Sequence, residues 1–348
     1  MRVALGQLPG LTDDYLTYAR QLGVPSVHVN TPALPGTRRW EVADLVALRR
    51  RAEGAGLRLE AIENVPNSFY MDAMLGRPGR DQQIADFQAT IRNVGAAGIP
   101  LLGYHFFPAQ VWRTSEGPDG RGGAVVTGYD HAIALDPERQ ADLLISRREK
   151  AQDDPFVRGA KYETDRVLDD DAMWDNYEYF IRAVIPVTEA AGVRLCLHPD
   201  DPPVPTLGGI ARLFRSVDGL RRARAMAASP AWALDLCLGT VSEMGGEAAV
   251  LEALDTFGPS GDIAYLHMRD VKGTVPAFHE CFIGEGNYDP AEVVRRLHRM
   301  GFDGFLIDDH VPRMLDDTPY CHRGRAHAVG YLQGLVHAIA GGRADAVA

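Results

Sequence analysis

The sequence predicts an α/β fold, a single (β/α)8 (TIM) barrel over residues 1–340 with a long insertion after the fourth strand. Short apolar runs rich in β-branched residues alternate with longer amphipathic stretches along the chain. This alternation is typical of parallel strands joined by helices, and eight such runs favour a closed barrel over an open sheet. A length of 348 residues is enough for one large barrel of this kind.

The alternation assigns each element in order. The expected strands cover residues 3–7, 26–30, 58–64, 101–106, 194–198, 232–237, 264–269 and 304–309. Amphipathic stretches between them predict helices over 40–55, 81–97, 171–191, 247–257 and 290–300. Glycines directly after three of these stretches are typical helix ends, namely Gly98, Gly192 and Gly301.

One segment does not fit the repeat. Residues 108–170 are polar and rich in glycine around 117–123, and charged around 147–154. They contain too few apolar residues to form a core of their own. A loop of this length in a compact barrel is usually an active-site lid, so we expect an inserted lid or loop here. Residues 341–348 are expected to fray.

The bulk composition restricts the function. Hydrophobic residues make up 46% of the chain and charged residues 24%, as in globular proteins with a sizeable core. A net charge of −11 argues against nucleic acid as a partner. No apolar run reaches the roughly 20 residues that span a bilayer, so we expect no membrane association. The strand-like start and four cysteines without a CxxC pair predict a cytoplasmic protein with reduced thiols.

Metal-type side chains follow the last four strands. His198, Cys237, His267 and the pair Asp308–Asp309 lie at the carboxyl ends of these strands, about 30 to 42 residues apart. In a barrel such ends face one cavity, so the spacing predicts a divalent metal centre. Alternation alone does not separate the two aspartates. Taken singly, each of these residues could be an ordinary polar residue where a strand ends at the surface. The four together favour a metal site. The ligand types suit Zn²⁺ or Fe²⁺, because a thiolate is a soft partner for Mn²⁺.

Further polar residues extend the predicted mouth. The first four strands end in polar residues as well, and such groups are costly to bury unpaired: Gln7, His28, Asn30, Glu63, Asn64, Tyr104 and His105. Beyond strand eight, His310 and Tyr320 are candidates for acid–base chemistry, while Arg313 and Arg325 could clamp a carboxylate. Trp112 and Arg113 begin the insertion, where they could close over a substrate or simply pack on the surface. Asp200 and Asp201 could orient imidazoles or cap a helical turn.

Several motifs together resemble those of the D-mannonate dehydratases of hexuronate catabolism, which have a xylose-isomerase-like barrel. Leu-His-Pro-Asp-Asp-Pro-Pro at 197–203 is the most specific of them. The shorter ones run in order between residues 62 and 326: Ile-Glu-Asn-Val-Pro (62–66), Ile-Arg-Asn-Val-Gly (91–95), Gly-Tyr-His-Phe-Phe-Pro (103–108), Trp-Arg-Thr (112–114), Cys-Leu-Gly-Thr (237–240), His-Met-Arg-Asp-Val (267–271), Phe-His-Glu (278–280), Asp-His (309–310) and Gly-Arg-Ala (324–326).

The resemblance implies a metal-dependent dehydratase that removes water from a sugar acid, with D-mannonate as the expected substrate and 2-keto-3-deoxy-D-gluconate as the product. It implies His198, Cys237, His267 and Asp309 as metal ligands, with Mn²⁺ first and Fe²⁺ second. His310 and Tyr320 match residues that act in catalysis. We expect the sugar acid to contact residues in and beside these motifs: Glu63, His105, Trp112, Arg113, Arg269, Arg313 and Arg325. A homo-oligomer is expected.

The chain departs from the family pattern at strand eight. The usual Arg-Pro-Asp-His is Ile-Asp-Asp-His at 307–310, which removes one candidate substrate contact, and the usual Arg-Asn after the strand-seven histidine is Arg-Asp at 269–270. Two alternatives therefore stand beside the dehydratase. One is a metal-dependent sugar isomerase or epimerase on the same barrel, and the other is a non-catalytic sugar-acid-binding paralogue.

Overall fold

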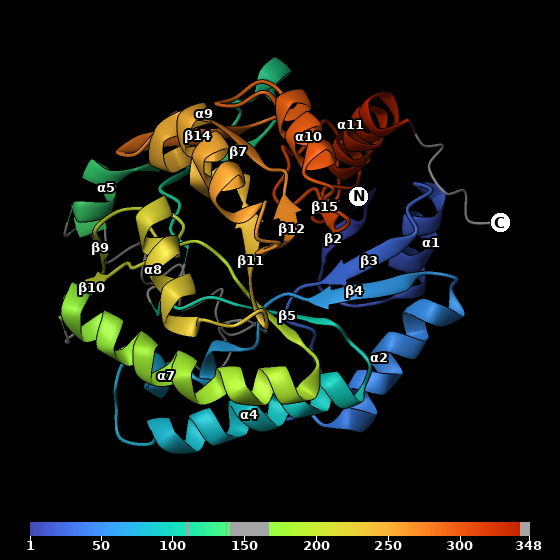
Figure 1. The fold of residues 1–348 in the computed structure, drawn as a ribbon. Helices are drawn as coiled ribbons and strands as arrows, with labels where there is room; N and C mark the ends of the chain where they lie inside the picture. The colour runs from blue at the N-terminus through green and yellow to red at the C-terminus, as the bar shows by residue number, and fades with distance from the viewer. Residues whose placement is uncertain (109–110, 137, 140–166, 342–348) are drawn as a thin grey trace.

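The computed structural model describes residues 1–108, 111–136, 138–139 and 167–341. Its central feature is a parallel barrel (Figure 1), which confirms the predicted fold class. The first strand is split into β1 (Arg2–Val3) and β2 (Leu5–Leu8). The barrel closes because β1 pairs with the last strand while β2 pairs with β3.

The remaining barrel strands follow the predicted order, and each pairs in parallel with its neighbours. They are β3 (Ser26–Val29), β4 (Arg58–Ile62), β5 (Leu101–Tyr104), β8 (Arg194–Leu197), β11 (Trp232–Cys237), β12 (Ile263–His267) and β15 (Phe305–Ile307). Since the strands are parallel, their carboxyl ends all open at one mouth of the barrel.

Helices surround the barrel, and α4 and α7 lie side by side in Figure 1. The long ones are α1 (Asp13–Gln21), α2 (Val42–Gly54), α4 (Arg80–Ala96), α7 (Asp170–Ala191), α8 (Val217–Ala227), α9 (Leu238–Phe257), α10 (Pro290–Arg299) and α11 (His322–Ala340). Short ones are η1 (Asn67–Phe69), α3 (Met71–Met74), η2 (Arg121–Gly123) and α5 (His131–Leu135). Side-chain caps begin several of them, as Asp169 does for α7. Among the described residues, no helix combines the length and apolar character needed to cross a membrane.

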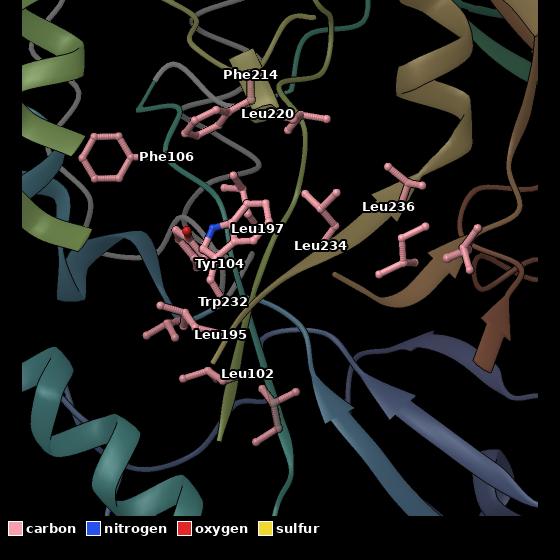
Figure 2. Packing of buried hydrophobic residues seen from close by; sticks show 14 of the residues in the cluster. Leu102, Tyr104, Phe106, Leu195, Leu197, Phe214, Leu220, Trp232, Leu234 and Leu236 are labelled. Atoms are coloured by element: carbon pink, nitrogen blue, oxygen red, sulfur yellow. The ribbon is translucent and has the colours of Figure 1, made fainter. Parts of the chain in front are cut away.

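Side-chain alternation divides the strands into two faces. Figure 2 shows Trp232, Leu234 and Leu236 of β11 in the apolar layer that also contains Phe214 and Leu220. The intervening residues point into the barrel, where small side chains pack around the stacked rings of Tyr265 and Phe305. The residues that continue this inward row at the strand ends therefore face the mouth.

Part of the insertion is strand, which the sequence prediction of a lid or loop did not include. The described portion contributes β6 (Ser115–Gly117) and β7 (Val126–Asp130). They join a hairpin after strand seven, β13 (Asp270–Thr274) and β14 (Ala277–Cys281), in an antiparallel sheet. The insertion has too few apolar residues for a core of its own, but Trp112 and Tyr129 share a core with Val271 and Phe278.

Two smaller differences concern the elements around this sheet. The predicted helix 247–257 begins earlier, at Leu238, and Gly245 and Gly246 interrupt it with non-helical backbone. The strands β9 (Thr206–Leu207) and β10 (Ile210–Ala211) form a short ribbon beyond β8. Residues 140–166 of the expected insertion, and 342–348 of the expected frayed tail, lie outside the described residues.

Candidate metal centre and active site

The barrel brings the four predicted metal ligands together at its mouth. One ligand atom each of His198, Cys237 and His267 lies within 4.8 Å of the others. Asp309 adds a carboxylate, because its Oδ2 is 3.5 Å from His267 Nδ1 and 3.8 Å from Cys237 Sγ. Each follows or ends a different strand, namely β8, β11, β12 and β15. The inward row of side chains on these strands explains why all four converge.

The chemistry of this donor set fits a divalent metal. His198 Nδ1 faces the carbonyl oxygen of Pro199 at 2.6 Å, so its other nitrogen is the one available to a metal. Nδ1 of His267 is buried and makes no hydrogen bond within the described part of the chain. Buried polar atoms normally have a partner, and a bound cation would supply one. Two imidazoles, a thiolate and a carboxylate also suit a metal of borderline softness.

Local charges prepare the thiol for this role. Burial alone would raise the pKa of Cys237, but the charge of Arg269 and the proximity of His198 and His267 lower it to about 5. Burial likewise opposes a charge on His198, yet the Cys237 thiolate raises its pKa to about 10. The metal-free site therefore contains an imidazolium–thiolate pair. A metal ion that binds there displaces the imidazole proton.

Arg269 lies behind the ligands as a buried cation. Its guanidinium is 2.8 Å from Asp201 Oδ2 and 3.1 Å from Glu280 Oε1. It also lies 3.3 Å from Asp309 Oδ2 and 3.6 Å from Cys237 Sγ. The N–H donors of Arg269, which the sequence prediction assigned to a substrate, are therefore engaged by these acids and the thiolate. Arg269 thus compensates negative charge around the metal centre.

His310 stands next to Asp309 with a fixed orientation. Its Nδ1 lies 2.8 Å from Glu280 Oε1, and its Nε2 is 3.8 Å from Asp309 Oδ1. The side chain is 45% exposed, so it can reach a bound molecule. Burial would lower its pKa, but Asp309 and Glu280 raise it above the usual value. These two carboxylates therefore favour the protonated form of the His310 imidazole.

Glu280 was not among the predicted site residues, although its Phe-His-Glu motif was noted. It belongs to β14, and the hairpin that carries it was not predicted. Besides His310 and Arg269, it lies 3.3 Å from Arg113 of the insertion. Arg113 also makes two bonds to Asp201, at 2.6 and 2.8 Å. The insertion is thereby tied to the metal centre through buried ion pairs.

Tyr320, the second predicted catalytic residue, is hydrogen-bonded through its hydroxyl to β2, near the N-terminus of the chain. The Oη donates to the carbonyl oxygen of Gly6 at 2.8 Å. The ring packs edge-on against Tyr15, and the Arg325 guanidinium lies 4.3 Å from its centre. Burial raises the pKa of Tyr320 well above its ordinary value. Because its pKa is raised, this hydroxyl gives up its proton less readily than a free tyrosine. The deprotonated form that would act as a base is therefore even harder to reach.

The pair that alternation left open, Asp308 and Asp309, is separated by the structure. Asp309 continues the inward row of Phe305 and Ile307, whereas Asp308 accepts from the Gly6 N–H at 3.0 Å. Arg325 lies 2.7 Å from Asp308 Oδ2 and donates to the Asp309 carbonyl at 2.8 Å. Asp309 has a left-handed backbone, with φ of 50°. The buried Arg325 therefore holds a ligand in place, and its predicted carboxylate clamp is engaged with Asp308.

The opposite half of the mouth is a hydrogen-bonded network. Glu63 accepts from Gln7 Nε2 at 2.7 Å and from Asn64 Nδ2 at 3.2 Å. Asn64 also donates to Asn30 Oδ1 at 3.2 Å and contacts His105 Nδ1 at 3.2 Å. Gln7 and Asn64 have positive φ values of 55° and 36°. Strained backbone of this kind often marks functional sites.

Glu63 also belongs to a second group of metal-type side chains. Its Oε2 is 3.0 Å from His28 Nε2 and 3.3 Å from His267 Nε2. Burial would raise the pKa of Glu63, but these two histidines hold it well below the usual range. Asp235 Oδ1 lies 3.0 Å from the same His267 nitrogen. Sequence reasoning missed Asp235, although an acid two residues before Cys237 in an apolar strand was a visible signal.

The remaining predicted residues lie farther out or in packing positions. Trp112 is buried in the small core that the insertion shares with the hairpin. Arg313 is exposed and lies 3.2 Å from Glu116. Asp200 accepts from the Phe214 N–H at 3.0 Å, so it supports a loop, whereas Asp201 contacts the arginines at the centre.

Comparisons with known proteins identify the family. The model of the family D-mannonate dehydratase (UxuA) matches residues 11–345. A mannonate dehydratase of Thermotoga neapolitana is 30% identical and covers 95% of this chain and 96% of its own. That of Thermotoga maritima is 29% identical over the same shares.

Solved structures give the same result. The crystal structure of mannonate dehydratase from Streptococcus suis superimposes with a TM-score of 0.81 at 25% identity, covering 97% of this chain and 93% of its own. A D-psicose 3-epimerase from Clostridium cellulolyticum, with a TM-score of 0.61 at 14% identity, covers 97% of this chain and 99% of its own and shares the fold alone. On this evidence the chain belongs to the D-mannonate dehydratase (UxuA) family of sugar-acid hydro-lyases.

Proposed function

We propose that this protein removes water from D-mannonate and releases 2-keto-3-deoxy-D-gluconate. The observation that carries the proposal is the convergence of His198, Cys237, His267 and Asp309 beside His310. The mannonate dehydratase relatives align over nearly the whole chain, so the likeness includes every strand that supplies these residues.

In this proposal the four converging side chains hold a divalent cation. When bound, such a cation supplies Lewis-acid stabilisation of the negative charge that develops next to the substrate carboxylate. We rank Mn²⁺ first from the resemblance and Fe²⁺ second, because the Cys237 thiolate suits a softer ion. Arg269 compensates the negative charge of the ligands from behind, and Arg325 fixes the backbone of Asp309.

His310 is our first candidate for proton transfer. Dehydration requires removal of a proton next to the carboxylate and protonation of the departing hydroxyl. Glu280 binds His310 Nδ1, which leaves Nε2 to face a substrate, and the raised pKa favours the form that donates a proton. Tyr320 is the second candidate, with a hydroxyl that must first leave the Gly6 carbonyl.

The predicted substrate contacts divide according to their partners. Arg269, Arg325 and Glu63 are buried among protein groups, so we assign them supporting roles. Arg113 and Arg313 keep part of their side chains exposed and remain our proposed carboxylate contacts. His105 and Trp112 are proposed to shape the mouth from β5 and the insertion.

Two wider proposals accompany the reaction. Cys237 must stay reduced to act as a ligand, and the four cysteines are free, which supports a reducing compartment such as the cytoplasm. Assembly into a homo-oligomer rests on the resemblance to the family alone.

The identity of the product tests the reaction. Protein loaded with Mn²⁺ should convert D-mannonate into a 2-keto-3-deoxy acid that is lighter by one water, as measured by mass spectrometry and a keto-acid assay. A product with the same mass as the substrate would indicate an isomerase or epimerase and would overturn the proposal. The His310→Asn variant serves as a control, because it should retain the metal while turnover falls.

A further inference from the structure

The two ring nitrogens of His267 face different surroundings. Nδ1 lies 3.5 Å from Oδ2 of Asp309, on the side of the metal ligands. Nε2 lies 3.0 Å from Oδ1 of Asp235 and 3.3 Å from Oε2 of Glu63, on the side of the barrel interior. A neutral imidazole that gives one nitrogen to a metal carries its proton on the other.

We propose that His267 binds the metal through Nδ1, and that Asp235 is the positioning residue which holds its Nε2–H. The inference rests on the metal centre proposed above. It adds a residue that acts on the metal through His267 and touches neither metal nor substrate.

The partners of the two carboxylates distinguish Asp235 from Glu63. Glu63 Oε2 already accepts from Gln7 at 2.7 Å and lies 3.0 Å from His28 Nε2. Asp235 Oδ2 accepts from the Tyr265 hydroxyl at 2.9 Å. Its Oδ1 makes no hydrogen bond within the described part of the chain and points at His267. Asp235 therefore has an acceptor atom reserved for the imidazole, whereas Glu63 is shared among other donors.

The strand register makes this contact rigid. Cys237 is paired with His267 and Asp235 with Tyr265 along β11 and β12. One strand thus supplies both a ligand and the group that orients the ligand of the next strand. Asp235 is completely buried near the apolar interior cluster, where a carboxylate is costly unless it is paired. An orienting role for His267 accounts for an acid in that position.

The first test is a metal titration of the full-length, metal-stripped protein. Replacing Asp235 by Asn should weaken Mn²⁺ binding by about 10- to 100-fold, the range found for outer partners of metal-bound histidines. Tyr265→Phe is the matched control, since it removes a bond to Oδ2 but leaves Oδ1 on His267; its effect should be smaller. Wild-type affinity in Asp235→Asn would overturn the positioning role.

A spectroscopic readout separates this inference from the metal centre itself. Co²⁺ should give a thiolate-to-metal charge-transfer band in the wild type, and Cys237→Ser should lose it. Asp235→Asn should keep the band but need more Co²⁺ to saturate it. Absence of the band in the wild type would refute the centre and the inference together. A band that saturates identically in Asp235→Asn would refute only the inference.

A crystal structure of the wild type with Mn²⁺ tests the same assignment without a variant. Metal on Nδ1 of His267, with Asp235 on Nε2, supports the inference. Metal on Nε2 contradicts it, even if Asp235→Asn fails to fold.

Discussion

The two halves of the barrel mouth use the same geometry for different chemistry. On β8, β11, β12 and β15, the inward row ends in two imidazoles, a thiolate and a carboxylate. On β2 to β5, it ends in amides and Glu63, which bond mainly to one another. The contact between Glu63 and His267 joins the two halves directly. The comparison teaches that parallel strand ends define a place, whereas the side chains at each end decide its chemistry.

The largest expected effect separates the two halves. His198→Ala should remove Mn²⁺ binding, because it deletes a ligand. Asn30→Ala, on the opposite half, should leave Mn²⁺ binding unchanged, because the Asn30 amide bonds to Gln7 and Asn64 and not to any of the four candidate ligands. Metal content after dialysis measures both. Equal loss of metal in the two variants would break the division.

The second-largest effect is expected for variants that impair proton transfer but retain the metal. His310→Asn should lower kcat by about 10²- to 10⁴-fold, the usual contribution of a positioned acid or base. Tyr320→Phe should cost less, because its hydroxyl is bound to the Gly6 carbonyl. Metal content should stay normal in both. Near-normal kcat in both variants would refute the assignment of catalysis to either residue.

The buried charges beside the four candidate ligands contribute to the stability of the fold. Arg269→Met removes one of the two arginines that pair with Asp201 and Glu280, and leaves Arg113 as the other. Breaking a buried ion pair in this way typically lowers the free energy of unfolding by about 3–5 kcal/mol. Denaturant unfolding of the metal-free protein measures it. A loss below about 1 kcal/mol, as for a surface pair, would show that Arg269 is not the central cation.

The pKa values of Cys237 and His198 predict that the stability of the metal-free fold depends on pH. In the metal-free fold, the pKa of Cys237 is about 5, so its thiolate adds stability above the ordinary thiol pKa of about 8.5 that is lost as pH falls toward 5. The pKa of His198 is about 10, so its contribution is complete below about 6.5 and lost as pH rises toward 10. Thiolate ultraviolet absorbance should titrate near pH 5 and vanish in Cys237→Ser. A midpoint near 8.5 would contradict the pairing.

The smallest effect is expected for a change at the exposed residue Arg313. Arg313→Ala breaks an exposed pair with Glu116, worth about 0–1 kcal/mol in stability. If Arg313 contacts the substrate carboxylate as proposed, KM for D-mannonate rises while thermal unfolding hardly changes. An unchanged KM would remove Arg313 from the proposed contacts.

The convergence of the candidate ligands could be predicted because their signal is local. Each of His198, Cys237 and His267 ends an apolar run, and one β-α unit separates each from the next. Resemblance then chose Asp309 over Asp308, and the inward row of β15 gives the physical reason. The barrel itself followed from the same alternation of strands and helices.

The supporting residues could not be predicted because their partners lie far away in the chain. Glu280 depends on a hairpin that pairs with the insertion, since Ala277 stands opposite Asp130. Arg325 looks like a substrate-binding group in sequence, but Asp308 binds it in the fold. Such roles follow from long-range pairing, which a pattern of neighbouring residues does not contain.

The most direct test of the account is the metal dependence of D-mannonate turnover. Metal-stripped protein should give no 2-keto-3-deoxy product, Mn²⁺ should restore it, and Cys237→Ser should stay inactive with the same Mn²⁺. Equal turnover without metal, or in Cys237→Ser, would contradict the claim that dehydration depends on a metal held at the ends of β8, β11, β12 and β15.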